Sequence, residues 1–351
     1  MRYPTLSCGR RSTKYLARVL PQDPRASRED MHKAMSLVVE QFPTILDYYV
    51  RGKEDDGARA TSVAKSRVAE VEARFGVHCG VLPPPVDLAT FRPVSARSVR
   101  PEVLINAAAY TAVDRAESEP DAAYAINAAA VGILADEAKR ADALLIHYST
   151  DYVFDGTKDA PYIEEDRPNP LNAYGRSKLA GERAIHDIGG AHLILRTSWV
   201  YSARGKNFLL TIRRLLREKK EIRVVSDQIG APTSARGIAE ATAELLRRHG
   251  AATLGDARGI YHATTSGSTS WHGFAREIAR LERSDSPARV VPIASSEYPA
   301  PARRPRNSRL SNEKLHRRFG VALPRWEASL EACHAMLAKS AELKADDHDA
   351  R

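Results

Sequence analysis

Short apolar runs alternate with longer amphipathic stretches between residues 101 and 340 of this 351-residue chain. The runs are rich in Val, Ile and Leu, which is typical of strands that are buried on both faces of a parallel sheet. Strands that alternate with helices predict an α/β fold, a mainly parallel sheet with helices on both faces. The predicted strands are residues 103–105, 143–148, 192–197, 222–225, 259–263 and 289–293. The predicted helices are residues 121–141, 173–187, 207–217, 235–249, 312–319 and 326–339, and Ser270 is expected to cap one more.

The first hundred residues follow a different pattern. Residues 31–50 and 62–75 are predicted to be helical, with Pro43 breaking or kinking the first helix, and Pro83–Pro85 form a stop or a stiff connector. None of the five glycines before residue 100 lies in a G-x-x-G-x-x-G or G-x-G-x-x-G pattern. The segment therefore lacks the glycine-rich turn that places a pyrophosphate at a helix N-terminus.

Polar side chains follow the predicted strand 143–148. Residues 149–151, Ser-Thr-Asp, put two hydroxyls and a carboxylate at the carboxyl end of that strand, where open α/β sheets bind ligands. Tyr174 and Lys178 begin the next helix and lie one turn apart on the same face. An ammonium near a phenol favours the phenolate, so Lys178 is expected to lower the pKa of Tyr174 toward neutral pH. Such a phenol can exchange a proton with a carbonyl or alcohol oxygen.

A serine hydrolase site is an alternative at the same strand end. His147, Ser149 and Asp151 alternate with other residues, so they lie in a row on one face of the strand. A hydrolase needs these groups to converge as nucleophile, base and orienting group. The spacing therefore favours proton exchange by Tyr174 over a nucleophilic serine.

In this order and spacing, the two motifs resemble the catalytic set of the short-chain dehydrogenase/reductase family. Further strings narrow the resemblance to the dTDP-4-dehydrorhamnose reductases, from about residue 101 to residue 337. The matching strings are Ser149–Gly156, Tyr174–Lys178, Asn106–Glu117, Arg196–Tyr201, Asp227–Thr233 and Arg303–Leu310. The resemblance implies a Rossmann-like fold with a smaller C-terminal substrate lobe. Family members begin with a strand and a glycine-rich turn, so the first β-α-β unit is replaced here.

The resemblance also implies NADPH-dependent reduction of the 4-keto group of dTDP-4-dehydro-L-rhamnose to dTDP-L-rhamnose. Tyr174 would donate a proton to the forming C4 alkoxide, Lys178 would hold the nicotinamide ribose, and Thr150 would hydrogen-bond the carbonyl oxygen. Asp151 and Trp199 are expected to contact the sugar. The residues expected to line the cofactor, besides Tyr174 and Lys178, are Ala109, Tyr110 and Thr111. NADH is an alternative to NADPH, and the resemblance is compatible with Mg²⁺ and with a homodimer, although the sequence places no metal site.

The resemblance also divides the chain into four segments. Residues 1–100 are an atypical N-terminal segment, residues 101–200 the remainder of the dinucleotide-binding domain, and residues 201–340 mainly a substrate-binding lobe. Residues 341–351 are polar and are expected to be a disordered tail. A foreign piece that replaced the first β-α-β unit is favoured over a divergent addition that completes the sheet differently.

Two other classes of function stay open. A non-catalytic regulatory subunit of the methionine adenosyltransferase type, or an inactive truncated reductase, would both tolerate a missing phosphate turn. The intact set of Thr150, Tyr174 and Lys178 favours an enzyme.

Charge and cysteine content exclude some partners. The formal net charge is +9, but no aromatic residues interleave with the basic clusters, so no nucleic acid is expected to bind. The basic loop Arg303–Arg309 is instead a candidate for gripping the diphosphate of a nucleotide sugar. Three scattered cysteines, Cys8, Cys79 and Cys333, argue for a reducing, cytoplasmic compartment. No stretch of 18 residues is free of charge, so no membrane span is expected, and no spacing predicts a structural zinc site.

Overall fold

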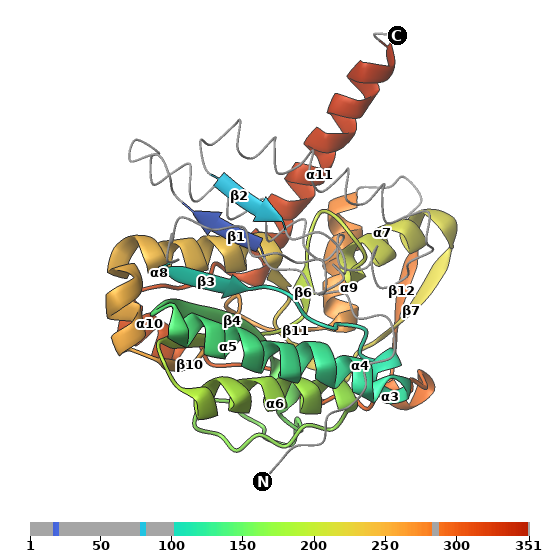
Figure 1. Cartoon of the computed structure of the whole chain (residues 1–351). Helices are drawn as coiled ribbons and strands as arrows, with labels where there is room; N and C mark the ends of the chain where they lie inside the picture. The colour runs from blue at the N-terminus through green and yellow to red at the C-terminus, as the bar shows by residue number, and fades with distance from the viewer. Residues whose placement is uncertain (1–16, 21–77, 82–101, 283–287, 350–351) are drawn as a thin grey trace, which may run out of the picture.

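The computed structural model describes residues 17–20, 78–81, 102–282 and 288–349 (Figure 1). The helices predicted at 31–50 and 62–75 lie outside the described residues. Four strands form the central sheet in the order β10-β5-β4-β3, and every neighbouring pair is parallel. These strands are β3 (Val103–Asn106), β4 (Leu144–Thr150), β5 (His192–Thr197) and β10 (Gly259–His262). The predicted α/β class with a parallel sheet is confirmed.

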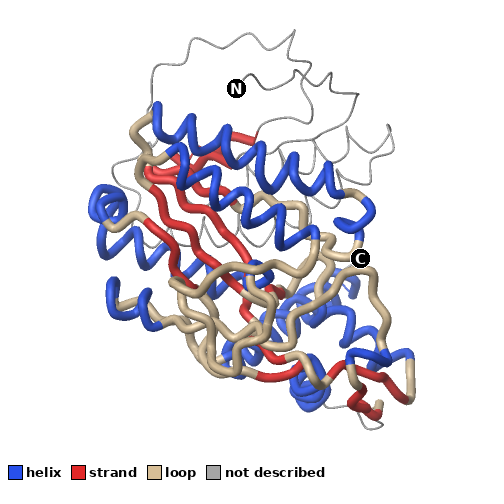
Figure 2. Tube along the Cα trace, turned by 90° about the horizontal axis from the view of Figure 1, so that it is seen from below, coloured by secondary structure: helices blue, strands red, loops and turns tan. Residues whose placement is uncertain are grey.

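Successive residues of β4 face opposite helix layers. Leu144 and Ile146 pack in one cluster with side chains of α8 (Ala235–Asp256) and α10 (Glu313–Phe319). Leu145 packs on the other face with side chains of α5 (Ala130–Arg140) and α6 (Ala173–Ile188). The tube view shows the strands between these helix layers (Figure 2). Burial on both faces explains why the strands are continuous apolar runs.

A second core lies beside the sheet. It is formed by Tyr201 and by side chains of five elements, including the parallel pair β7–β12. These elements are α7 (Phe208–Glu218), β7 (Glu221–Val225), α9 (Trp271–Glu282), β12 (Arg289–Ile293) and α11 (Trp326–Asp349). Residues after 201 contribute to both cores, because α8, β10 and α10 return to the central sheet.

Further short strands pair outside the central sheet. Parallel β6 (Val200–Tyr201) and β9 (Thr233–Ser234) are one pair, and antiparallel β8 (Ile229–Gly230) and β11 (Thr269–Ser270) are another. Ser270 caps α9 as predicted, since its Oγ accepts a hydrogen bond from Gly273 N at 2.9 Å. In the N-terminal segment, β1 (Ala17–Leu20) pairs antiparallel with β2 (His78–Val81) and contacts β3.

Three helices differ from their predicted bounds by more than one residue at an end or by a break. The helix expected at 121–141 is broken into α4 (Pro120–Tyr124), a π-helical turn at Ala125–Ala129, and α5, after the short α3 (Arg115–Ser118). Helix α8 kinks rather than ends at Gly250, whose φ of 70° suits glycine, and then continues to Asp256. Helix α11 extends through Asp349, so the tail expected to be disordered from residue 341 is helical to that point. Its Ala, Glu, Leu and Lys residues have high helix propensity, which outweighs its polarity.

A buried ion pair joins helix α6 to strand β5. Arg196 donates to both carboxylate oxygens of Glu182, from Nε at 2.9 Å and from a terminal nitrogen at 2.7 Å. Both side chains are at most 3% exposed. Ser149, the first residue of the motif at the end of β4, also donates to Glu182. The pair therefore fixes α6 against the strands that carry the candidate site.

We expect Glu182→Gln to lower the free energy of unfolding by about 3–5 kcal/mol, because it leaves the Arg196 guanidinium buried without its counter-charge. The matched control is Glu218→Gln, which breaks the Arg214–Glu218 pair, whose side chains are 58% and 49% exposed. An exposed pair contributes at most about 1 kcal/mol. Chemical denaturation of both variants measures the difference, and equal losses would contradict a structural role for the buried pair.

Candidate active site

The carboxyl end of β4 turns sharply into the candidate site. Thr150 Oγ1 accepts a hydrogen bond from Tyr152 N at 3.1 Å, which starts a 3₁₀ turn at Asp151–Val153. The same hydroxyl donates to Asp151 Oδ1 at 3.0 Å. Thr150 and Asp151 are both buried, at 5% and 3% exposure. The turn therefore holds a hydroxyl and a carboxylate side by side at the end of the sheet.

Helix α6 begins against this turn. Asn172 caps the helix, with Oδ1 accepting from Gly175 N at 2.7 Å. A Cβ at Gly175 would lie 2.2 Å from the carbonyl oxygen of Tyr152, so only glycine permits this close approach. The contact brings Tyr174 to the end of β4, where the Thr150 hydroxyl lies close enough to lower the pKa of the phenol. Thr150 and Tyr174, predicted from separate motifs, come together.

The pKa of Tyr174 differs from the sequence expectation. Burial raises it above its ordinary value, the Asp151 carboxylate raises it further, and only the Thr150 hydroxyl opposes this. The predicted lowering by Lys178 is therefore wrong for this structure. The reason lies in the surroundings of Lys178, whose Nζ donates to the Tyr148 carbonyl oxygen at 2.6 Å. Burial lowers the pKa of Lys178 itself to about 8.

Asp151 is a second perturbed group at the site. Burial raises the pKa of its carboxyl to about 7, against the opposing hydrogen bonds from Ser308 and Thr150. Its Oδ2 has no hydrogen-bond partner among the described residues. A buried polar atom without a partner costs free energy. An oxygen of this kind is suited to accept a hydrogen bond from a bound hydroxyl.

The serine hydrolase alternative fails on geometry. The hydroxyl of Ser149 donates to Glu182, whereas the His147 ring contacts Asn106 and Lys178. Asp151 is engaged by Thr150. The three groups have different partners and do not form a nucleophile–base–acid chain.

The loop after β3 carries the residues predicted to line the cofactor. Ala109 is half-buried, Tyr110 is buried and Thr111 is exposed, and the Tyr110 hydroxyl donates to Glu119 at 2.7 Å. Asn127, in the π-helical turn, accepts from Tyr110 N at 2.8 Å and donates to Tyr110 O at 3.0 Å. The loop is thereby clamped next to α6.

Sequence reasoning missed two positioning residues. Asn127 also donates to Ser177 Oγ of α6 at 2.9 Å, and Glu182 anchors the same helix to β5. Glu182 could have been found, because Tyr174, Lys178 and Glu182 follow one another at four-residue spacing on one helix face. Asn127 gave no such signal, since its role depends on the π-helical turn.

Trp199 lies in an aromatic stack. Its ring is parallel to that of Trp271, with 3.6 Å between the ring centroids and an interplanar angle of 8°. A Cβ at Gly230 would lie 2.5 Å from the Trp199 ring, so Gly230 is needed for this packing. Trp199 also has a positive φ of 48°, which is rare for a bulky residue. The contacts explain how the indole is held, and the predicted contact with the sugar stays a prediction.

We expect Trp199→Ala to weaken nucleotide-sugar binding more than cofactor binding, because an indole offers a flat apolar face to a deoxysugar. It should also lower stability, since Trp271 loses its stacking partner. The control is Trp271→Ala, which breaks the same stack but leaves the Trp199 indole in place. Titrations with each ligand beside thermal melts separate the two effects. Equal weakening of both ligands by Trp199→Ala would contradict a sugar contact.

The basic loop packs on the candidate site. Arg304 donates to both oxygens of Asp114, at 3.0 and 2.8 Å, and its charge lowers the pKa of that carboxyl. Arg309 donates to Asn307 Oδ1 at 2.9 Å, whereas Arg303 and Arg306 are exposed. Arg304 therefore orders the loop that carries Ser308. Binding of a diphosphate by the exposed arginines stays a prediction.

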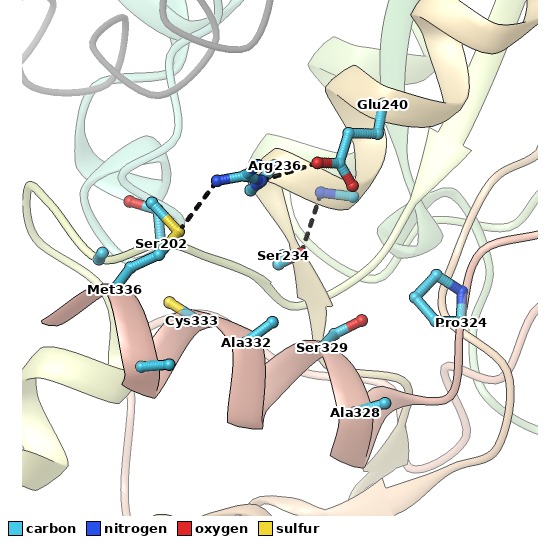
Figure 3. A pocket seen from close by; sticks show the side chains of 13 residues that line it. Ser202, Ser234, Arg236, Glu240, Pro324, Ala328, Ser329, Ala332, Cys333 and Met336 are labelled. Carbon is cyan, nitrogen blue, oxygen red and sulfur yellow. Dashed lines mark hydrogen bonds and ion pairs between the residues drawn. The ribbon is translucent and has the colours of Figure 1, made fainter. Parts of the chain in front are cut away.

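A cavity of about 410 Å³ lies away from these residues, between the start of α8 and α11 (Figure 3). Small side chains such as Ala332 and Ser329 line it, and Arg236 reaches across it to Met336 while pairing with Glu240 of its own helix. Within the described ranges, no three His, Cys, Asp or Glu side chains stand close enough together to hold a metal ion. None of the helices in the described part of the chain has the length and apolar character to cross a membrane.

Comparisons with known proteins agree with this geometry. The family model for the RmlD substrate binding domain matches residues 84–339. A dTDP-4-dehydrorhamnose reductase of Burkholderia thailandensis is 53% identical over 246 residues, which are 67% of this chain and 81% of that protein. One from Escherichia coli K12 is 43% identical over 269 residues, 73% of this chain and 87% of that protein.

Solved structures show the same relationship. A dTDP-4-dehydrorhamnose reductase of Bacillus anthracis in complex with NADP superposes with a TM-score of 0.63 at 37% identity. The superposition covers 68% of this chain and 82% of that protein. The predicted extent of the resemblance, about 101–337, is confirmed, and residues 1–83 are outside the family match. From about residue 84 to residue 339, the chain belongs to the RmlD substrate-binding family, that of the dTDP-4-dehydrorhamnose reductases.

Proposed function

We propose that this chain reduces the 4-keto group of dTDP-4-dehydro-L-rhamnose with NADPH, giving dTDP-L-rhamnose. The observation that carries the proposal is the convergence of Thr150 and Tyr174 at the carboxyl end of β4, with Lys178 buried one turn away. The Burkholderia and Escherichia relatives bear this activity in their names. The Bacillus relative was solved with NADP.

The nicotinamide side of the site fits such a cofactor. The carboxyl ends of β3 and β4 meet beside α6, and small residues at 107–109 leave room near the backbone. Lys178 is one turn below Tyr174 on the same helix face. The bound nicotinamide would supply a hydride to C4. Tyr174 and Lys178 would hold its ribose.

A side chain of this protein can supply the proton that the reduction requires. Its raised pKa keeps Tyr174 a neutral phenol near neutral pH, so the residue carries the proton that a C4 alkoxide needs. Thr150 Oγ1 lies beside this phenol and can donate to the carbonyl oxygen as negative charge develops there. Asp151 Oδ2 would accept from a sugar hydroxyl. Thr150 and Asp151 are buried and Tyr174 is half-buried, so the protein itself shields most of the reacting atoms from water.

The direct test is the reaction itself. Purified chain is incubated with dTDP-4-dehydro-L-rhamnose and NADPH, NADPH consumption is followed by absorbance, and the product is identified by NMR. The proposal predicts dTDP-L-rhamnose and consumption that requires the sugar. Nucleotide-sugar binding without turnover would instead favour an inactive truncated reductase, and stimulation of a methionine adenosyltransferase would favour the regulatory alternative.

We also propose that the chain forms a homodimer and is located in the cytoplasm. Light scattering tests the oligomeric state, and fractionation of the source cells tests the location.

A further inference from the structure

Three buried polar side chains contact one another in a row from β3 through β4 to α6. Asn106 and His147 are register partners on the parallel strands β3 and β4, and Asn106 Nδ2 lies 3.0 Å from His147 Nδ1. On the other side of the ring, His147 Nε2 lies 3.2 Å from Lys178 Nζ. All three side chains are at most 5% exposed. The proposed proton donation by Tyr174 does not account for His147.

Hydrogen-bond chemistry fixes the orientation of Asn106 and the tautomer of His147. Asn106 Oδ1 accepts from Ala108 N at 3.1 Å, so the amide nitrogen faces the imidazole. An amide nitrogen can only donate, and His147 Nδ1 must therefore accept with its lone pair. Burial holds the pKa of His147 well below its usual range. The neutral ring thus carries its one proton on Nε2.

This tautomer presents an N–H, not a lone pair, to Lys178. An ammonium has three donors and no acceptor, so it cannot accept this N–H, whereas a neutral amine can accept it. The same amine still donates to Tyr148 O at 2.6 Å. Both hydrogen bonds of Nζ can therefore form when Lys178 is a neutral amine, in agreement with the lowered pKa of Lys178.

We propose that His147 is a positioning residue which, with its tautomer fixed by Asn106, favours the neutral amine of Lys178 and couples the charge of Lys178 to the loop 107–111. Protonating Lys178 adds one proton to the pair. The ammonium then needs the lone pair of Nε2, so the ring proton must be on Nδ1, and Asn106 must turn Oδ1 toward it. That rotation releases Ala108 N. The role of this coupling in catalysis rests on the proposed reductase function.

Other charged groups around Lys178 do not replace the contact between its amine and the His147 ring. Glu182, one turn later on α6, raises the pKa of Lys178, but both its oxygens are engaged by Arg196 of β5. Tyr174, one turn earlier, is neutral at working pH, and Asp151 faces Tyr174. His147 is thus the titratable side chain of β4 that touches the amine.

The experiment is NMR of the full-length chain without ligands. Labelling with ¹⁵N-histidine reports the tautomer of His147, whose signals are assigned by their loss in His147→Gln. Labelling lysine at Cε reports the titration of Lys178, assigned with Lys178→Met. We expect a Lys178 titration midpoint near 8, where burial places its pKa, and above that pH we expect Nε2 protonated and Nδ1 unprotonated in the wild type.

The diagnostic variant is Asn106→Asp. A carboxylate accepts from both Ala108 N and His147 Nδ1, so the ring proton should move to Nδ1 and leave a lone pair for Lys178. The Lys178 midpoint should rise by about 1–3 pH units. The control is Asn172→Asp, which adds the same charge at the buried cap of α6. It should leave the His147 tautomer unchanged.

The outcomes separate this inference from the proposed function, because the NMR signals need neither NADPH nor the sugar. A wild-type ring protonated on Nδ1 above the Lys178 midpoint, or a Lys178 that titrates near 10.5, would overturn the inference even in an active reductase. So would an unchanged tautomer in Asn106→Asp whose thermal melt shows a folded protein. An inactive chain with the expected tautomer would overturn only the reductase proposal.

Discussion

Replacing Tyr174 by Phe should lower the turnover of dTDP-4-dehydro-L-rhamnose by about 10²–10⁴-fold, the usual contribution of a positioned acid. The substitution removes the proton that the C4 alkoxide needs and leaves the ring in place. Binding of the nucleotide sugar should change little, because the edge-on contact with Tyr152, at 6.0 Å between ring centroids, survives. Steady-state kinetics beside a binding titration measure both quantities.

The matched control for this prediction is Tyr201→Phe. Tyr201 is 1% exposed, packs in the second core, and its hydroxyl has no hydrogen-bond partner among the described residues. The same chemical change there should leave turnover within about twofold, since it removes no hydrogen bond and no proton used in the reaction. A loss below tenfold in Tyr174→Phe would remove the residue from the proton-donor role.

The structure also changes how Tyr174 is expected to work. The sequence predicted a phenol whose pKa is lowered by Lys178, which suits a base in the oxidative direction. Burial and Asp151 instead raise the pKa, which suits an acid in the reductive direction. The four-residue spacing gave the shared helix face correctly. It could not give the direction of the Lys178 amine, which depends on the Tyr148 carbonyl and the His147 ring of another strand.

Local patterns and long-range contacts were therefore predictable to different degrees. The strands of the central sheet and the helix that begins at Ala173 follow from apolar runs and from a cap residue, so the sequence predicts them closely. The π-helical turn at 125–129 and the kink at Gly250 depend on packing that one segment alone does not encode. The Asn106–His147 contact depends on strand register, which no pattern within either strand specifies.

The position of β3 bears on how the chain can hold the pyrophosphate of the cofactor. Strand β3 ends the four-stranded sheet, and β1 contacts it while pairing with β2. In a dinucleotide-binding sheet, the phosphate turn follows a strand at the centre of the fold and opens a helix. The sequence before residue 100 has no glycine-rich turn of that kind.

The chain should consequently bind NADPH far more weakly than the Bacillus anthracis relative, which was solved with NADP. Backbone N–H groups at a helix N-terminus make charge-assisted hydrogen bonds to a pyrophosphate. Each is worth about 1.5–3 kcal/mol. Losing two of them costs about 3–6 kcal/mol, and the dissociation constant should rise by about 10²–10⁴-fold. Calorimetry or fluorescence titration of both proteins at one salt concentration measures the difference.

Restoring the missing unit should restore binding. Residues 1–86 are replaced by a strand–glycine turn–helix unit from a family member that carries one. The new strand can pair with β3, the end strand of the described sheet, and its turn would supply amides to the pyrophosphate. The matched control carries the same graft with the turn glycines changed to alanine, because a Cβ there blocks the close approach of a phosphate. Micromolar NADPH binding by the unaltered chain would show instead that residues 1–100 supply the amides themselves, and that the segment completes the sheet rather than replacing part of it.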